Sequence, residues 1–293
     1  MSASARQNRA GLALLAPAAI LATVFLLLPL LAIIVLAFTD YQLGDRSLRF
    51  IGLGNFRDLA EDHAFWRSLS NTLIYSAIVV PGSVGLGLAS ALLVNSSASF
   101  KSFYRTVFFL PVMASLLAMA VVWEFMLQPS FGIANAVMKL LGLAPHNWLK
   151  ESGLALYVLA VIGIWQSFGF NMVLFMAGLS TIPRELYDAA NIDGAPNAWT
   201  RFTLVTWPQL GAVTIFVAIT SGIRSFQVFD TVQSLTQGGP NKATEVLLYT
   251  VYAEGFEFLR SGRAAALTVV FLVLILAIGL LRFLYPGRQG EAA

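Results

Sequence analysis

The chain alternates between long apolar runs and shorter polar segments. Six runs are predominantly apolar over roughly 20 residues or more, the length that an α-helix needs to cross a bilayer. This pattern predicts an all-α fold, a polytopic membrane helix bundle with six transmembrane helices in a single domain over residues 1–293. The predicted spans are residues 12–38, 70–94, 106–128, 153–179, 208–226 and 264–285.

The composition supports a membrane protein. Of 293 residues, 58% are hydrophobic and only 11% are charged, and the mean hydropathy is +0.76. These values lie well outside the range of soluble globular domains. Arg6 and Arg9 precede the first run in the manner of a signal peptide. That run is far longer than the ~7–15 apolar residues of a signal peptide, and further runs follow it, so we expect it to remain as a span.

One polar segment, residues 181–207, stands out between two apolar runs. Pro183 suits the first turn of a helix, where its missing N–H is harmless, and Glu185 follows where a carboxylate favours the helix dipole. Gly194 is a natural helix stop, and a second short helical stretch runs through Trp199. The segment is too charged to cross a bilayer. It predicts a polar helix-loop-helix that serves as a docking surface.

The order of residues in this segment carries a family resemblance. Asp188-Ala-Ala-x-x-x-Gly194, a polar interval and an apolar stretch reaching Trp207-Pro208 follow one another. This arrangement resembles the EAA loop of membrane subunits in binding-protein-dependent ABC importers, specifically sugar permeases of the maltose and glycerol-3-phosphate type. The family usually has Glu at the first position and Leu-Pro at the end, and this chain is one residue longer after the glycine. Other segments resemble further parts of the family pattern and occur in the same order along the chain as in the family. They are residues 50–56, 108–111, 229–230 and 238–245.

The resemblance implies that energy comes from another subunit. The chain contains no G-x-x-x-x-G-K-[ST] motif, so it has no P-loop to cradle phosphates, and ATP and Mg²⁺ are expected on a partner ATPase. We expect no cofactor and no metal on the chain itself. The resemblance assigns ATPase coupling to Asp188, Ala189, Ala190, Asp193 and Gly194, and contact with a binding protein to Gly238, Gly239 and Pro240.

The resemblance also implies a set of partners. They are a second permease subunit, usually a different but similar chain, an ATPase dimer, and a periplasmic or surface solute-binding protein that delivers a carbohydrate or related polar solute. Membrane lipid surrounds the spans. No nucleic-acid partner is expected, because the formal net charge is only +3 and the basic residues are spread over the loops.

Basic residues in the short loops set the predicted orientation. Arg6 and Arg9 precede the first span, and Lys101 and Arg105 lie between the second and third, without an acid in either segment. Because Lys and Arg are enriched in cytoplasmic loops, these segments are predicted to be cytoplasmic. With six spans, both termini and residues 181–207 lie on the cytoplasmic side. The resemblance implies that the membrane is the bacterial cytoplasmic (inner) membrane.

Polar side chains inside the spans are candidates for the substrate pathway, because such groups are costly in lipid and usually face a cavity or a partner. Asn171 is favoured, since an amide both donates and accepts hydrogen bonds to a polyhydroxylated ligand. Glu124 and Arg224 are also open to a second interpretation, an ion pair that joins two spans. The candidates are Trp123, Glu124, Asn171, Arg224, Gln227 and Asp230.

Other functions are less well supported. The chain has two histidines, His63 and His146, and no H-E-x-x-H motif, so an enzyme is not expected. A self-sufficient secondary carrier or channel for a polar solute is the main alternative, and it predicts coupling carboxylates within the spans.

Two further features concern packing. Gly82, Gly85 and Gly87 in the second span are predicted to allow close helix approach. Residues 129–152 are predicted to contain a short amphipathic helix, which lies either at the outer membrane interface or packed over the bundle.

Overall fold

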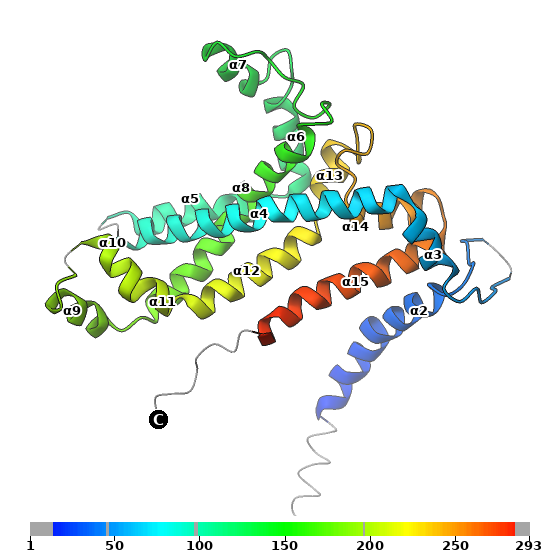
Figure 1. Cartoon of the computed structure of the whole chain (residues 1–293), viewed down its shortest axis with the longest axis horizontal. Helices are drawn as coiled ribbons and strands as arrows, with labels where there is room; N and C mark the ends of the chain where they lie inside the picture. Colours follow the sequence, from blue (N-terminus) through cyan, green and yellow to red (C-terminus); the bar gives the residue numbers. More distant parts are fainter. Residues whose placement is uncertain (1–13, 45–46, 97–98, 196, 285–293) are drawn as a thin grey trace, which may run out of the picture. The chain divides into compact units, whose positions relative to one another are not determined.

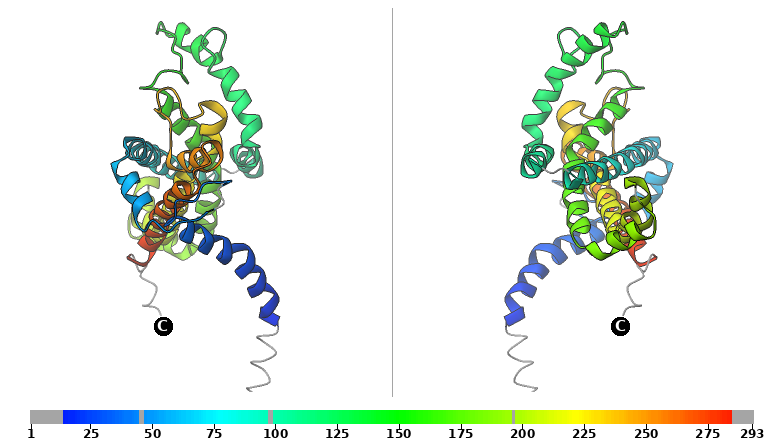
Figure 2. Two further views of the ribbon diagram at one scale, coloured as in Figure 1. Left: turned by 90° about the vertical axis from the view of Figure 1, so that its right-hand side faces the viewer. Right: turned by 90° about the vertical axis from the view of Figure 1, so that its left-hand side faces the viewer.

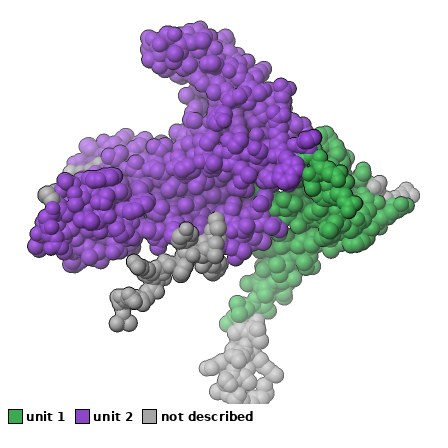
Figure 3. All heavy atoms as spheres, viewed as in Figure 1, with its two compact units in different colours: residues 1–62, 250–272 green, residues 63–249, 273–293 purple. Residues whose placement is uncertain are grey.

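The computed structural model describes residues 14–44, 47–96, 99–195 and 197–284. Regular structure in these ranges is helical, apart from an isolated antiparallel bridge between Thr39 and Phe50. The chain forms two compact units (Figure 3), unit 1 with Met1–Asp62 and Thr250–Leu272, and unit 2 with His63–Tyr249 and Val273–Ala293. The prediction of an all-α membrane protein is confirmed.

Figure 1 labels the helices. Unit 1 contains a π-helical segment at Thr23–Leu27, α2 (Leu28–Leu36), α3 (Gly54–Glu61) and a second π-helical segment at Ala253–Glu257. Two helices, α14 (Leu247–Tyr252) and α15 (Ser261–Leu284), each have residues in unit 1 and residues in unit 2. Unit 2 contains α4 (His63–Ser96), α5 (Lys101–Met113), α6 (Leu116–Met126), α7 (Ile133–Leu140), α8 (Ala155–Ser180), α9 (Arg184–Ile192), α10 (Ala198–Arg201), a π-helical segment at Phe202–Thr206, α11 (Trp207–Gln209), α12 (Gly211–Phe226) and α13 (Asp230–Leu235).

Five of the predicted spans correspond to single membrane-length helical stretches. Residues 12, 13 and 285, at the edges of the first and sixth predicted spans, lie outside the described residues. Within the described residues, the stretches long and apolar enough to cross a membrane are Leu14–Leu36, His63–Ser96, Ala155–Ser180, Gly211–Leu235 and Ser261–Leu280.

The predicted third span, residues 106–128, is not one straight helix. Its two parts, α5 and α6, meet at a bend of 95° (Figures 1 and 2), and a total of six spans requires this pair to be one broken span. Ala114 and Ser115 between them have extended backbone conformations. Pro111 lacks an N–H for the last turn of α5, and serine is a residue type favoured at helix starts. The chain can therefore end one helix and begin another without becoming less apolar.

Unit 1 contains a cluster of ion pairs near the start of α15. Arg263 pairs with Asp62, and its Nε also lies 3.3 Å from a carboxylate oxygen of Glu254. Arg260 lies 3.4 Å from the other oxygen of Glu254. Glu254 is buried, with 7% of its surface exposed. The two cations offset the cost of burying this carboxylate, which links α15 to the preceding π-helical segment.

Within unit 2, glycines allow α4 and α8 to pack closely. A Cβ at Gly87 would lie 2.7 Å from the Asn171 Cβ and 3.1 Å from the Met172 backbone nitrogen. A Cβ at Gly82 would lie 2.5 Å from a side chain of α8, whereas one at Gly85 would meet nothing within 4 Å. Small residues permit such approach between membrane helices. The packing prediction is confirmed for Gly82 and Gly87 and is wrong for Gly85.

A buried apolar cluster continues this interface toward α9. Tyr187 and Ala190 of α9 pack against the cluster and fix the polar loop to the helices behind it. Its members from α4, α8 and the segments that follow are Ala91, Val94, Met172, Phe175, Leu179, Ile182, Val205, Leu210 and Val217.

The two ends of α4 contact different loops. Near its start, the Asn71 amide donates to the backbone oxygens of Lys242 (3.1 Å) and Glu245 (2.9 Å). The Leu247 N–H donates to Thr72 Oγ1 at 2.8 Å. The last turn of α4 lines a groove with α9 and α10. About 20–25 residues of α4, or roughly 30–38 Å, separate these two contacts, which matches the ~30 Å of a hydrocarbon core, so a membrane crossed by α4 would have the two loops on opposite sides.

The predicted amphipathic helix is present as α7. Asn135 is buried and organises the loop that follows, because it donates to the His146 carbonyl oxygen (2.8 Å) and accepts from Trp148 Nε1 (2.9 Å). The apolar side chains of Ile133 and Leu140 are exposed. This exposure favours a position at a membrane interface over a helix packed on the bundle.

Replacing Gly87 by alanine is expected to destabilise unit 2, because the added methyl group meets the α8 backbone. Overpacking of this kind costs about 1–3 kcal/mol. Thermal unfolding of the purified protein in detergent measures the effect as a lower Tm. The control is Gly85→Ala in the same helix, where the methyl group has open space and helix propensity improves, so its Tm should be unchanged or higher. Equal melting temperatures for the two variants would contradict the packing described here.

Candidate functional site

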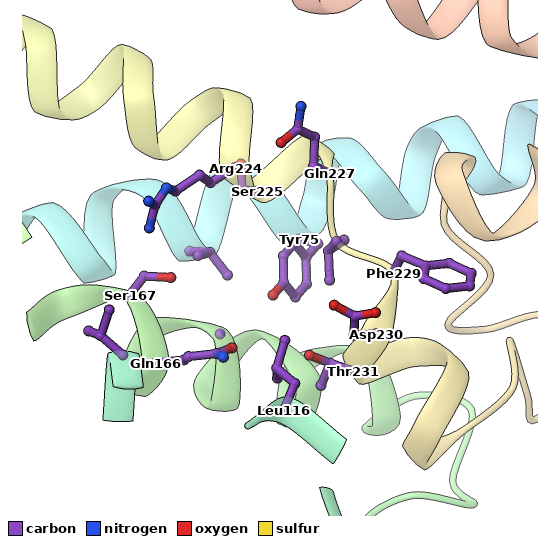
Figure 4. Close-up of a pocket in the computed structure, with 14 residues that line it drawn as sticks. Tyr75, Leu116, Gln166, Ser167, Arg224, Ser225, Gln227, Phe229, Asp230 and Thr231 are labelled. Atoms are coloured by element: carbon purple, nitrogen blue, oxygen red, sulfur yellow. The ribbon is translucent and has the colours of Figure 1, made fainter. Parts of the chain in front are cut away.

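A polar pocket lies in unit 2 where α4, α6, α8 and α12 meet the segment leading into α13 (Figure 4). Its volume is ≈ 280 Å³, near the lower end for small-molecule sites. Val79, Val112 and Leu116 form apolar walls. The polar side chains around it are Tyr75, Gln166, Ser167, Arg224, Ser225, Gln227, Asp230 and Thr231.

Three of the predicted pathway residues, Arg224, Gln227 and Asp230, line this pocket. Figure 4 shows the Asp230 carboxylate pointing into a space that the Tyr75 hydroxyl and the Gln166 amide also enter, whereas the Gln227 side chain points away from it. A carboxylate, a phenol and an amide together supply both donors and acceptors of hydrogen bonds. The chemistry of the pocket therefore suits a polar, oxygen-rich molecule.

Arg224 does not form the ion pair considered from the sequence. Its guanidinium carbon lies 3.9 Å from the centre of the Phe170 ring, a cation–π contact. The ion pairs among the described residues include none between Arg224 and Glu124. The ion-pair interpretation is therefore wrong for this structure. The aromatic ring contacts one face of the guanidinium, which leaves its N–H donors available at the pocket edge.

Asn171, the favoured pathway candidate, lies between helices and not in the pocket lining. It is 2% exposed, its Nδ2 donates to Ser83 Oγ (3.2 Å), and its Oδ1 accepts from Ser221 Oγ (3.1 Å). These hydrogen bonds join α8 to α4 and to α12. The geometry gives Asn171 a packing role and does not support direct contact with a ligand.

The sequence-based candidates omit Tyr75, Gln166 and Ser167. Gln166 and Asn171 are five residues apart on α8, a rotation of about 140° at 3.6 residues per turn, so the two side chains cannot share a face. The available signal was the adjacent polar pair at 166 and 167 within an apolar run. A single sequence does not reveal which face the neighbouring helices leave open.

Glu124 and Trp123 lie elsewhere. Glu124 lines a second pocket, of ≈ 460 Å³, together with Gly239 and Pro240 from the loop before α14. Trp123 packs edge-on against Trp165 with ring centres 5.4 Å apart. Neither residue lines the first pocket. The structure thus places Glu124 beside the predicted binding-protein loop and gives Trp123 a packing contact.

The loop that contains Gly238, Gly239 and Pro240 is firmly held. Gly238 is buried with a φ of +77°, and a Cβ there would lie 2.9 Å from the Tyr249 ring. Thr244 Oγ1 donates to the Gly239 carbonyl oxygen at 2.6 Å. Gly239 and Pro240 are half-buried. The exposed side chains of this loop are Gln237, Asn241 and Lys242.

The predicted helix-loop-helix is present as α9 and α10. Pro183 has an extended conformation and α9 begins at the next residue, as the proline predicts. Asn197 caps α10, its Oδ1 accepting from the Thr200 N–H at 2.7 Å. Both helix starts are therefore fixed by local sequence.

Gly194 ends α9 through a Schellman turn. Its φ of +85° lies in the left-handed region, which glycine adopts without strain. The Ala195 N–H donates to the Ala190 oxygen (2.9 Å), and the Gly194 N–H donates to the Asn191 oxygen (3.4 Å). These bonds fix the direction in which the chain leaves α9.

The predicted coupling residues divide between two faces of α9. Ala190 packs inward on the apolar cluster beside Tyr187, whose hydroxyl lies 3.1 Å from Thr206 Oγ1. Ile192, which lies close to carboxylates in the sequence, is 86% exposed. The remaining coupling residues, all exposed, are Asp188, Ala189, Asp193 and Gly194.

A helical membrane bundle with a polar pocket among its helices and a polar helix-loop-helix at one end is typical of a component of a membrane transport system. Residues 83–288 match the family described as "Binding-protein-dependent transport system inner membrane component", and the chain belongs to this family. It is a permease component of an ABC importer, a multi-pass protein of the inner membrane. Family membership favours this function over a self-sufficient carrier or channel.

Two relatives cover most of the chain. The lactose transport system permease protein LacF of Rhizobium radiobacter is 35% identical over 94% of this chain and 92% of its own length. The sn-glycerol-3-phosphate transport system permease protein UgpA of Agrobacterium fabrum is 31% identical over 83% of each chain.

A solved structure has the same fold. A chain of a bacterial alginate ABC transporter, crystallised in complex with an alginate pentasaccharide-bound periplasmic protein, matches with a TM-score of 0.85 and 23% identity. The match covers 98% of this chain and 97% of that one. The backbone arrangement is therefore shared along nearly the whole chain.

Substitutions at Gln166 and Asn171 are expected to have different effects. Gln166→Ala removes a polar group from the pocket and should lower solute uptake by the assembled importer about two- to tenfold, as expected for one hydrogen bond of about 0.5–1.5 kcal/mol. Its Tm should be unchanged. Asn171→Ala removes interhelical hydrogen bonds worth about 0.6–1.7 kcal/mol in membranes and should lower Tm. Uptake assays and thermal unfolding of both variants separate the roles, and the reverse result would contradict this assignment.

Proposed function

We propose that the pocket between α4, α8 and α12 forms part of the translocation pathway for a carbohydrate or a related polyol. One observation carries this proposal: three polar groups line the same pocket. They are the Tyr75 hydroxyl, the Gln166 amide and the Asp230 carboxylate. Sugar hydroxyls both donate and accept hydrogen bonds and match such a lining. The named solutes of the relatives, lactose and glycerol 3-phosphate, are likewise rich in oxygen.

The exposed face of α9 is proposed as the contact with a separate ATPase subunit, which binds ATP and Mg²⁺. Asp188 would pair with a basic group of that subunit, and Ala189 and Gly194 would permit close backbone contact. The support is their exposure, the rigid Schellman turn and the resemblance to the EAA loop. Because α9 is anchored on the apolar cluster of unit 2, a displacement of the loop would be transmitted to α4 and α8.

The α9 side of the membrane is proposed to be the cytoplasm, with both termini on that side. Lys101 lies in the groove beside α9 and Arg105 follows one turn later on α5, as expected for a cytoplasmic loop. Arg6, Arg9 and Arg288 lie outside the described residues. The loop at residues 238–245 contacts the opposite end of α4 and would face outward.

The outward loop is proposed to receive the solute-binding protein, with contact made by Asn241 and Lys242 because these side chains are exposed. The second pocket, with Glu124, Gly239 and Pro240, lies in the same region. A second, similar permease subunit would complete the pathway. The chain itself would catalyse no reaction and bind no nucleic acid.

Gly194→Trp is expected to abolish coupling while the chain still folds. The bulky side chain would occupy the docking face, and losing a central contact of an interface costs about 2 kcal/mol or more. Uptake by the assembled importer should therefore fall more than about tenfold, measured in proteoliposomes supplied with ATP.

Gly142→Trp provides a matched control. Gly142 follows α7, has a φ of +74° and resembles Gly194 in that a Cβ added at either residue would meet nothing within 4 Å. Both substitutions impose similar backbone strain. Comparable Tm values with loss of uptake in Gly194→Trp alone support docking at α9. Normal uptake in Gly194→Trp would contradict it.

A further inference from the structure

A groove of ≈ 1110 Å³ lies beside α9, between the end of α4, the start of α5 and the α9–α10 segment of unit 2. It is separate from the polar pocket and lies beside the exposed face of α9. Three cationic side chains line it, Lys101, Arg184 and Arg201, and no aspartate or glutamate does. The carboxylates of Glu185 and Asp188 on α9 are not part of its lining.

None of these three cations takes part in an ion pair within the part of the chain that the structure describes. Lys101 Nζ donates to the Asn95 carbonyl oxygen at 2.9 Å, which holds it at the groove. Arg201, in the last turn of α10, is half-buried. Like charges gathered in one groove repel one another, and an anion would relieve this repulsion.

The rest of the lining is apolar or aromatic. Leu92 and Leu93 provide aliphatic surface, and Leu93 is 65% exposed, whereas Leu179 and Ile182 in the lining are buried. Trp199 at the groove is 73% exposed and stacks on Phe202 with ring centres 5.6 Å apart. Exposed tryptophan is typical of the boundary between lipid and water. The groove thus combines a cationic part with an apolar part, a pattern that matches an anionic amphiphile.

We propose that this groove binds the phosphate headgroup of an anionic phospholipid from the cytoplasmic leaflet. Arg184, Arg201 and Lys101 would surround the phosphate, since guanidinium groups bind phosphate oxygens in a bidentate manner and lysine adds a point charge. The acyl chain would lie along Leu92 and Leu93. Basic pockets between membrane helices on the cytoplasmic side bind such headgroups. The proposal rests on the orientation proposed above.

A lipid in this position would act on the docking loop. Arg184 and Tyr187 line the groove, and Asp188 follows Arg184 by four residues, so it lies one turn further along the same side of α9. A bound lipid would therefore lie beside the proposed docking face and support α9 at its edge.

The test is a lipid titration of the full chain, purified in detergent with the subunits that accompany it and then delipidated. Phosphatidylglycerol should raise Tm in a saturable way, and phosphatidylcholine or inorganic phosphate at the same concentration should not. In Lys101→Gln/Arg201→Gln, the apparent Kd for phosphatidylglycerol should rise about tenfold or more, since each basic residue contributes about 1 kcal/mol to binding of anionic lipid.

Two variants serve as controls. Arg105→Gln removes a cation one turn from Lys101 that does not line the groove, so its Kd should rise much less than that of the double variant. Arg201→Lys keeps the charge and should retain binding, which separates charge loss from misfolding. Equal stabilisation by phosphatidylcholine, equal stabilisation by inorganic phosphate, or an unchanged Kd in the double variant would each overturn the proposal. This assay needs no transport, so its outcome is distinct from that of the coupling test.

Discussion

The close approach of α4 and α8 is the constraint on which the rest of unit 2 depends. Lipid gives helices no hydrophobic reason to associate, so packing and interhelical hydrogen bonds must hold them. Gly87 brings α4 against the backbone of α8, and Asn171 ties α8 to Ser83 and Ser221. With this frame fixed, the polar pocket forms to one side of the interface, and the apolar cluster that anchors α9 continues it.

This frame also relates the proposed sites to one another. Asn71 and Thr72 hold the loop before α14 at one end of α4, and the last turn of α4 lines the groove beside α9 at the other. The polar pocket contains Tyr75 of α4 and Gln166 of α8. A movement of α9 would reach the pocket through packed helices, as the proposed alternating access by a separate ATPase requires.

Much of the fold could be predicted from the sequence because its signals are local. Hydropathy located the spans, and Pro183 and Gly194 marked the ends of α9 because each residue type restricts the backbone directly. The 95° bend between α5 and α6 was missed, since an apolar run stays apolar across a break. The sequence favours Asn171 as the pathway amide and does not single out Gln166, because the face that each residue presents depends on the neighbouring helices. The groove cations come from distant segments that meet only in the fold.

The central claim is that α9 docks on a separate ATPase, and cross-linking tests it most directly. The chain has no cysteine, so Asp188→Cys introduces a single reactive thiol. Cross-linking in membranes of the native host, followed by purification and mass spectrometry, should recover an ATPase subunit joined at residue 188, whereas Gly142→Cys in the same assay should not. Absence of any ATPase adduct at residue 188, together with solute uptake driven by an ion gradient without ATP, would contradict the account.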